Sequence, residues 1–124
     1  METEGRVVVA DFEAGLGTLS RLKPGQVDVF LVVAGPTAKA VEVARRALAM
    51  IREKDAGRAL LVANRIAGDE DRKLLQAAFG AAMTLVPEDA AMREADARGI
   101  AVFDHAPHAS AVQRVRALAE SLLE

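Results

Sequence analysis

The sequence predicts an α/β domain in three layers, built on a mainly parallel sheet of about four or five strands. Short runs of continuous apolar residues recur along the chain, and such runs are typical of strands buried on both faces. Segments with the apolar periodicity of amphipathic helices separate these runs. Alternation of strand and helix at this spacing is typical of a parallel sheet covered by helices. The 124 residues have room for one such domain, residues 1–124.

Four apolar runs give the predicted strands, and a fifth run is weaker. The four are residues 7–10 (VVVA), 29–34 (VFLVVA), 60–63 (LLVA) and 83–86 (MTLV), and the weaker one is 100–103 (IAVF). We expect the strands at Val7 and Val29 to pair directly through a right-handed crossover, because an unpaired edge is an aggregation hazard. A swapped or edge-paired dimer is the alternative.

Four helices are predicted between and after the strands. The first covers residues 37–54, with Leu48 central to its apolar stripe, Arg46 on its solvated face, Thr37 as the N-cap and Gly57 as the stop. The other three are a helix capped by Asp69, a helix over residues 87–98 ended by Gly99, and a helix over 109–123 with Val112, Val115, Leu118 and Leu122 inward.

Composition excludes several classes of protein. The formal net charge of -2 argues against a nucleic-acid binder, and the 52% of apolar residues argues against disorder. The absence of cysteine excludes disulfides and thiolate metal sites and fits a cytoplasmic protein. The polar start METEG predicts no signal peptide, and no apolar run reaches the ~20 residues of a membrane span.

Polar or turn-forming residues follow the predicted strands where each one ends. They are Asp11, Gly35-Pro36-Thr37, Asn64-Arg65 and Pro87-Glu88-Asp89. Ligands of open parallel sheets bind beyond the carboxyl ends of the strands, so this edge is the candidate site. The competing interpretation is that strand ends need turns and caps in any case.

The order of these features resembles a known family. DFEAGLGTLSR, residues 11–21, is similar to the segment after the Walker B strand in the MinD/ParA (deviant Walker, SIMIBI) class of P-loop ATPases, and especially to the nickel-insertion ATPases of carbon monoxide dehydrogenase maturation. The runs VDVFLVVAGPTAKAVEVARR, LLVANRI and LVPEDAAMREADARGIAV resemble later parts of that family in register. The resemblance implies the second half of a Rossmann-like P-loop ATPase domain.

The resemblance also implies roles for individual residues. Asp11 matches the Walker B acid, which holds the Mg²⁺ shell, and a carboxylate suits that ion. The segment from Glu13 to Gly15 matches a switch that reports the γ-phosphate. Asn64 and Arg65 match the pair that binds the adenine base, by hydrogen bonds and by stacking. Pro87 and Asp89 match residues of the loop that closes over the base in that family.

Each of these residues has a simpler interpretation. Asp11 could only cap the following turn, and Asn64 could only tolerate a left-handed turn. Arg65 could be a solvated side chain, and Glu13 a surface acid. Asp104, His105 and His108 in DHAPH could ligate a metal, but two histidines without a third strong ligand favour a solvated loop.

The phosphate loop of the family is missing from these 124 residues. No G-x-x-x-x-G-K-[ST] motif occurs, and Gly15-Leu16-Gly17-Thr18 lacks the lysine. Phosphoryl transfer depends on positioning and electrostatic stabilisation, which that loop supplies. We therefore expect weak binding of ATP and Mg²⁺ or none, and no hydrolysis by the chain alone.

Three functions remain open. The leading one is a non-catalytic module that acts in protein interaction or regulation, with a homodimer or a phosphate-loop-bearing chain as partner. The alternative is an ATPase subunit or fragment, acting in metallocentre maturation or cellular positioning, to which a missing N-terminal half or another chain supplies the loop. A third is a pure interaction domain that uses the surface around Glu13. A phospho-receiver is disfavoured, because Asp11 and Glu13 are the only candidate acids for its site.

Overall fold

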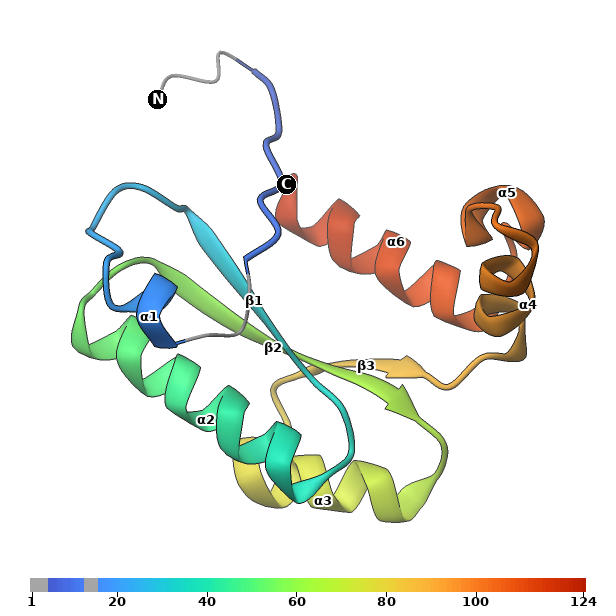
Figure 1. The fold of residues 1–124 in the computed structure, drawn as a ribbon, viewed down its shortest axis with the longest axis horizontal. Coiled ribbons are helices and arrows are strands. Elements are labelled where there is room, and N and C mark those ends of the chain that lie inside the picture. The colour runs from blue at the N-terminus through green and yellow to red at the C-terminus, as the bar shows by residue number, and fades with distance from the viewer. Residues whose placement is uncertain (1–4, 13–15) are drawn as a thin grey trace.

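A computed structural model of the chain describes residues 5–12 and 16–124. Its sheet, within these residues, has three parallel strands in the order β1-β2-β3 (Figure 1). The strands are β1 (Val29–Ala34), β2 (Arg58–Ile66) and β3 (Thr84–Pro87). The helices are α1 (Leu16–Leu19), α2 (Ala38–Glu53), α3 (Asp69–Phe79), α4 (Ala90–Arg98), α5 (Val102–His105) and α6 (Ser110–Leu122).

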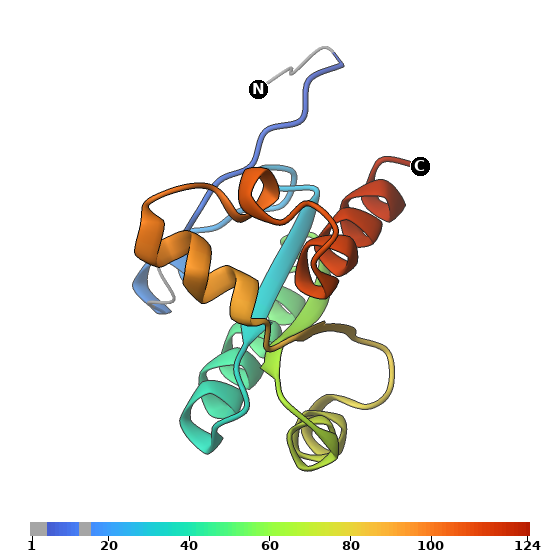
Figure 2. The ribbon, with the colours of Figure 1, turned by 90° about the vertical axis from the view of Figure 1, so that its right-hand side faces the viewer.

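The elements form three layers, as the sequence predicted. Leu61 and Ala63 of β2 belong to one buried cluster with residues of α2 and α3, whereas Val62 belongs to another with Ala111 of α6. Successive side chains of a strand point to opposite faces, so α6 covers the face opposite to α2 and α3. Figure 2 shows α6 on one side of the strands, away from the other two helices.

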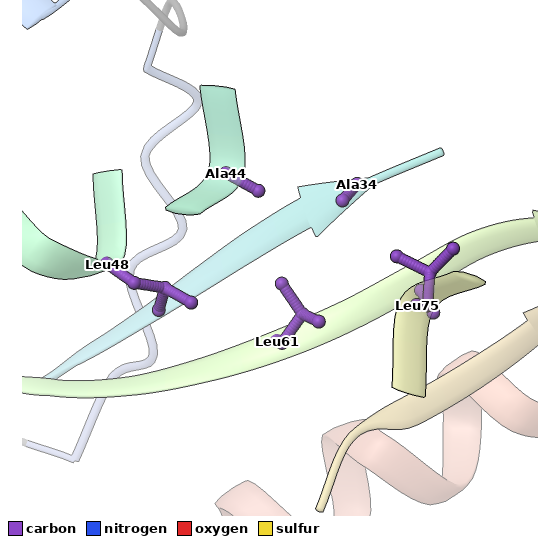
Figure 3. Packing of buried hydrophobic residues seen from close by; sticks show 6 residues of the cluster. Ala34, Ala44, Leu48, Leu61 and Leu75 are labelled. Atoms are coloured by element: carbon purple, nitrogen blue, oxygen red, sulfur yellow. The ribbon is translucent and has the colours of Figure 1, made fainter. Parts of the chain in front are cut away.

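Small side chains let α2 lie close to the sheet. Ala34 of β1 and Ala44 of α2 are nearly inaccessible to solvent and face each other across the main core (Figure 3). Leu48, Leu61 and Leu75 fill the space around them and come from three different elements. The alanine-rich composition therefore serves close packing between helix and sheet.

Caps set the helix boundaries close to the predicted positions. The hydroxyl of Thr37 accepts a hydrogen bond from the N–H of Ala40 at 3.1 Å, so the predicted N-cap of α2 is confirmed. Gly99 ends α4 in the left-handed region, with φ 67°. Asp69 is the first helical residue of α3 and Gly68 is its N-cap, one residue earlier than predicted.

Two predicted strands are wrong, so the sheet is smaller than expected. Residues 7–10 are extended but belong to no strand, and Val9 is 89% exposed. β-branched residues favour a strand where a neighbouring strand and a packing surface exist, and among the described residues this segment pairs with no strand and stays largely exposed. The direct pairing predicted between the strands at Val7 and Val29 is therefore also wrong.

The strand predicted at residues 100–103 is the second one that is wrong. Val102 begins the short helix α5, because the chain turns back after Gly99 and the carbonyl of Ala101 accepts hydrogen bonds from the N–H groups of Asp104 and His105. DHAPH is consequently half helical instead of a loop.

Burial is less complete than the apolar runs suggested. Leu31 and Val33 of β1 are 43% and 59% exposed, because α6 covers β3 and the adjoining part of β2 but leaves this face of β1 bare. Val115 of α6 was predicted to point inward and is 52% exposed, whereas Val112 is buried. Within the described residues, no helix is long and apolar enough to cross a membrane.

Candidate functional site

A pocket lies at the carboxyl ends of β2 and β3, beside α4. Its volume is about 400 Å³, within the ordinary range for small-molecule sites. The lining comes from the strand ends and from α4, α5 and α6: Asn64, Arg65, Val86, Pro87, Glu88, Asp89, Met92, Arg93, Ala95, Asp96, Ile100, Val102 and Ala111. The position is the edge where parallel α/β sheets bind ligands.

The end of β2 is irregular at the pocket. Its pairing with β3 shifts register between Ala63 and Ile66, and Arg65 adopts the left-handed region with φ 62°. Positive φ is uncommon for a residue with a side chain and often marks a site where geometry matters. The left-handed residue is thus Arg65, whereas a left-handed turn had been one interpretation of Asn64. Asn64 itself is half-buried in the pocket wall.

Two arginines share one carboxylate at the rim. Arg65 Nε lies 3.3 Å from Glu88 Oε2, and Arg93 Nη1 lies 3.5 Å from Glu88 Oε1. Both arginine side chains are 71% exposed, whereas the Glu88 side chain is 27% exposed. Glu88 therefore orients two planar cations that remain open to solvent, and such a plane can stack on a ring.

Asp89 holds two helices together beneath the pocket. Its Oδ1 accepts a hydrogen bond from the N–H of Ala91 at 3.0 Å, and its Oδ2 accepts one from the N–H of Ala111 at 3.1 Å. These backbone bonds, first that from Ala111 and then that from Ala91, hold the pKa of Asp89 below its ordinary value. Both oxygens are engaged, so the carboxylate acts as a cap for α4 and for the start of α6.

The remaining wall is apolar. Val86 is buried, whereas Met92 and Ile100 are each 45% exposed and border the hollow. Val102 closes it from α5. An apolar floor with an amide and two guanidinium planes at the rim suits a flat ring with polar edges.

Four of the residues that the sequence singled out line this one pocket: Asn64, Arg65, Pro87 and Asp89. Asp11 does not line it and lies exposed in the extended segment of residues 5–12. Glu13 and Gly15, the switch-like pair, lie outside the described residues.

One of the two histidines, His105, contacts a carboxylate outside the pocket. His105 Nε2 lies 3.2 Å from a carboxylate oxygen of Glu94, and its side chain is 16% exposed. In the part of the chain that the structure describes, no three histidine, cysteine or acidic side chains converge as a metal site would require.

Arg93 was not predicted from the sequence, although one signal for it was present. Its signal was the spacing alone, because Arg93 follows Asp89 by four residues and so lies on the same face of α4.

This architecture is similar to that of a solved structure, the septum site-determining protein MinD complexed with Mg-ADP from Pyrococcus horikoshii. The TM-score is 0.61, with 21% sequence identity over 77% of this chain. The chain has a MinD-like fold. It spans 41% of the length of that MinD chain. No family model matches the sequence, and no curated protein sequence matches it.

The MinD-like fold accounts for the parallel order of the strands and for the helices on both faces of the sheet. It agrees with the resemblance to the MinD/ParA class that residues 11–21, 27–46, 60–66 and 85–102 carry.

Proposed function

We propose that this chain is a non-catalytic module with a MinD-like fold that binds an adenine-type base weakly and acts in protein interaction or regulation. The observation that carries the proposal is the convergence of Asn64, Arg65, Pro87 and Asp89 on one pocket with an apolar floor. Asn64 offers both a donor and an acceptor to a base edge, and Arg65 offers a plane for stacking.

The charges at the pocket favour a base over a phosphate. Glu88 neutralises much of the field of Arg65 and Arg93, and the carboxylate of Asp96 adds a further negative charge to the lining. The sequence contains no phosphate loop, whose amides and lysine would meet a triphosphate. We infer that the base supplies the binding energy and the phosphates supply little.

Calorimetric titration with adenosine tests the pocket. We expect a dissociation constant in the millimolar range and about a tenfold loss in Asn64→Ala, because a polar base edge loses its partner. Gln76→Ala is the matched control, since Gln76 lies exposed on α3 and does not line the pocket. Equal affinity in Asn64→Ala and wild type would place the base elsewhere.

A second candidate function is an ATPase subunit completed by another chain, in metallocentre maturation or cellular positioning. It is favoured by one observation, that the chain spans 41% of the length of the MinD chain it resembles. The likeness of residues 11–21 to the nickel-insertion ATPases favours metallocentre maturation within this candidate.

Mixing this chain with a polypeptide that carries a G-K-G-G-x-G-K-[ST] loop separates the two functions. The second candidate requires ATP hydrolysis in the mixture and in neither chain alone, with loss of turnover in Asp11→Asn. Hydrolysis that is absent from the mixture supports the non-catalytic module.

A further inference from the structure

We propose that two copies of this chain form a dimer in which residues 7–11 of each copy add as a parallel strand to the free edge of β1 in the other. This inference does not depend on the nucleotide pocket. It rests on an open strand edge, on an unpaired extended segment, and on the charges that set their register.

The edge of β1 is unprotected. Within the described residues, β1 pairs only with β2, in an unbroken register from Val29 with Arg58 to Ala34 with Ala63. Its six residues contain no charge and no proline, the features with which proteins usually blunt an edge. The exposed side chains of Leu31 and Val33 border this edge on the face that α6 leaves bare.

The other edge of the sheet is blunted. β3 has four residues, ends in Pro87 and has a register irregularity against β2. Proline cannot donate a ladder hydrogen bond, and bulges disrupt pairing. A strand from another molecule therefore finds its template at β1.

Within the described residues, one extended segment near the N-terminus pairs with no strand. Val7, Val8 and Val9 are 67%, 64% and 89% exposed in an extended segment outside the sheet, at the end of the chain marked N in Figure 1. Among the described residues, no backbone hydrogen bond involves residues 6–11. Three consecutive exposed valines are costly to leave in water and have high β-propensity. The segment and the edge thus each lack what the other provides.

Charge selects the direction and the register. With Val7 beside Val29 in a parallel ladder, Arg6 lies beside Asp28, and neither residue forms an ion pair in the described part of the chain. The antiparallel direction would instead bring Asp11 next to Asp28, and two carboxylates repel. The parallel arrangement also continues the direction of the existing sheet.

The partner at the edge of β1 is a second copy of this chain, because each copy has both an open strand edge and an extended segment that can pair with it. In the described part of the chain, residues 5–12 form no ladder with β1 of their own molecule, although the following helix α1 is anchored to the core by Leu19. A two-fold symmetric exchange places each segment on the partner's edge, so the dimer contains two identical contacts and a closed interface.

Sedimentation of the full chain with paired charge variants tests the exchange. We expect wild type to dimerise, and Arg6→Glu and Asp28→Lys each to raise the dimer dissociation constant about tenfold, because both contacts in either homodimer then oppose like charges. An equimolar mixture of the two variants should regain the wild-type constant, since both contacts of the heterodimer are complementary.

Proline substitutions at two adjacent positions, Val8 and Val9, test the hydrogen bonds between the added strand and β1. Alternate residues of an added strand donate to the edge, so one of Val8→Pro and Val9→Pro should weaken the dimer far more than the other. Both positions are exposed in the single chain, so unchanged circular dichroism is the control for folding. A wild-type monomer at millimolar concentration, or variants whose mixture associates no better than each alone, would overturn the proposal.

Discussion

At the scale of single residues, the two faces of α2 differ in what a truncation costs. Leu48 is 7% exposed in the main core, so Leu48→Ala should lower the free energy of unfolding by about 2–5 kcal/mol. Arg46 pairs with Glu42 at 3.1 Å but its side chain is 63% exposed, so Arg46→Ala should change it by no more than about 0.5 kcal/mol. Urea denaturation of both variants measures the difference, and equal midpoint shifts would contradict the helix phase.

Gly57 is a residue whose missing side chain matters. A Cβ at this position would lie 2.6 Å from the carbonyl oxygen of Val27 and 3.1 Å from the Phe30 ring. The first neighbour is backbone and cannot swing away, so Gly57→Ala should destabilise the fold by about 1–3 kcal/mol, as overpacking does.

Gly35 is the control for that substitution. A Cβ there meets no heavy atom within 4 Å, so Gly35→Ala should leave the thermal midpoint nearly unchanged. A Gly57→Ala protein as stable as wild type would show that the loop between α2 and β2 can shift at no cost. The prediction of Gly57 as the stop of α2 is wrong, because the helix ends at Glu53 and Lys54 is its C-cap.

At the scale of elements, Asp89 joins the starts of α4 and α6, and its effect should depend on pH. The folded pKa is lowered, so the carboxylate stabilises the fold above the unfolded pKa of about 3.9, and this contribution is lost as pH falls below it through the folded pKa. Asp89→Ala should therefore have a lower urea midpoint than wild type at pH 7, and the gap should close on acidification below about pH 4.

Asp96→Ala provides the comparison for that series. Asp96 lies exposed on the same helix and forms no ion pair or side-chain hydrogen bond in the described part of the chain. Its midpoint should follow that of wild type across the pH range. A gap for Asp89→Ala that persists at low pH would mean that the side chain acts through packing instead of through its charge.

The elements also show what the sequence could predict. Periodicity and caps located α2, α4 and α6 because an amphipathic stripe and a capping side chain are local features of the sequence. The strand predicted at residues 7–10 failed because β-propensity describes packing against neighbours, and the three valines are largely exposed and pair with no strand in the described part of the chain. The helix α5 was missed because one carbonyl, that of Ala101, organises its four residues.

The sequence predicted several residues that line the pocket but not the contacts between them. Strand-end reasoning brought Asn64, Arg65, Pro87 and Asp89 together, since parallel strands end at one edge. It could not reveal that Glu88 pairs with both Arg65 and Arg93, nor that the backbone of Arg65 is left-handed. It also could not show that the Asp89 carboxylate is engaged by two backbone N–H groups.

At the scale of the whole molecule, the chain should bind ATP with Mg²⁺ no more tightly than adenosine. The molecule carries a formal net charge of -2, and Glu88 and Asp96 lie among the residues that line the pocket. A triphosphate gains little there, because Glu88 already pairs with Arg65 and Arg93 and the sequence contains no phosphate loop. Base stacking adds roughly 1–3 kcal/mol, whereas a millimolar dissociation constant requires about 4 kcal/mol, so the constant for ATP should be millimolar or weaker.

Calorimetry with adenosine and ATP in parallel, together with a phosphate-release assay, checks this expectation. The physical reason for an absent turnover is the same as that for weak binding, because phosphoryl transfer needs charge stabilisation that this sequence does not contain. Micromolar affinity for ATP, or turnover that disappears in Asp11→Ala, would contradict it. Either result would mean that the chain contains a phosphate site of a kind other than the P-loop.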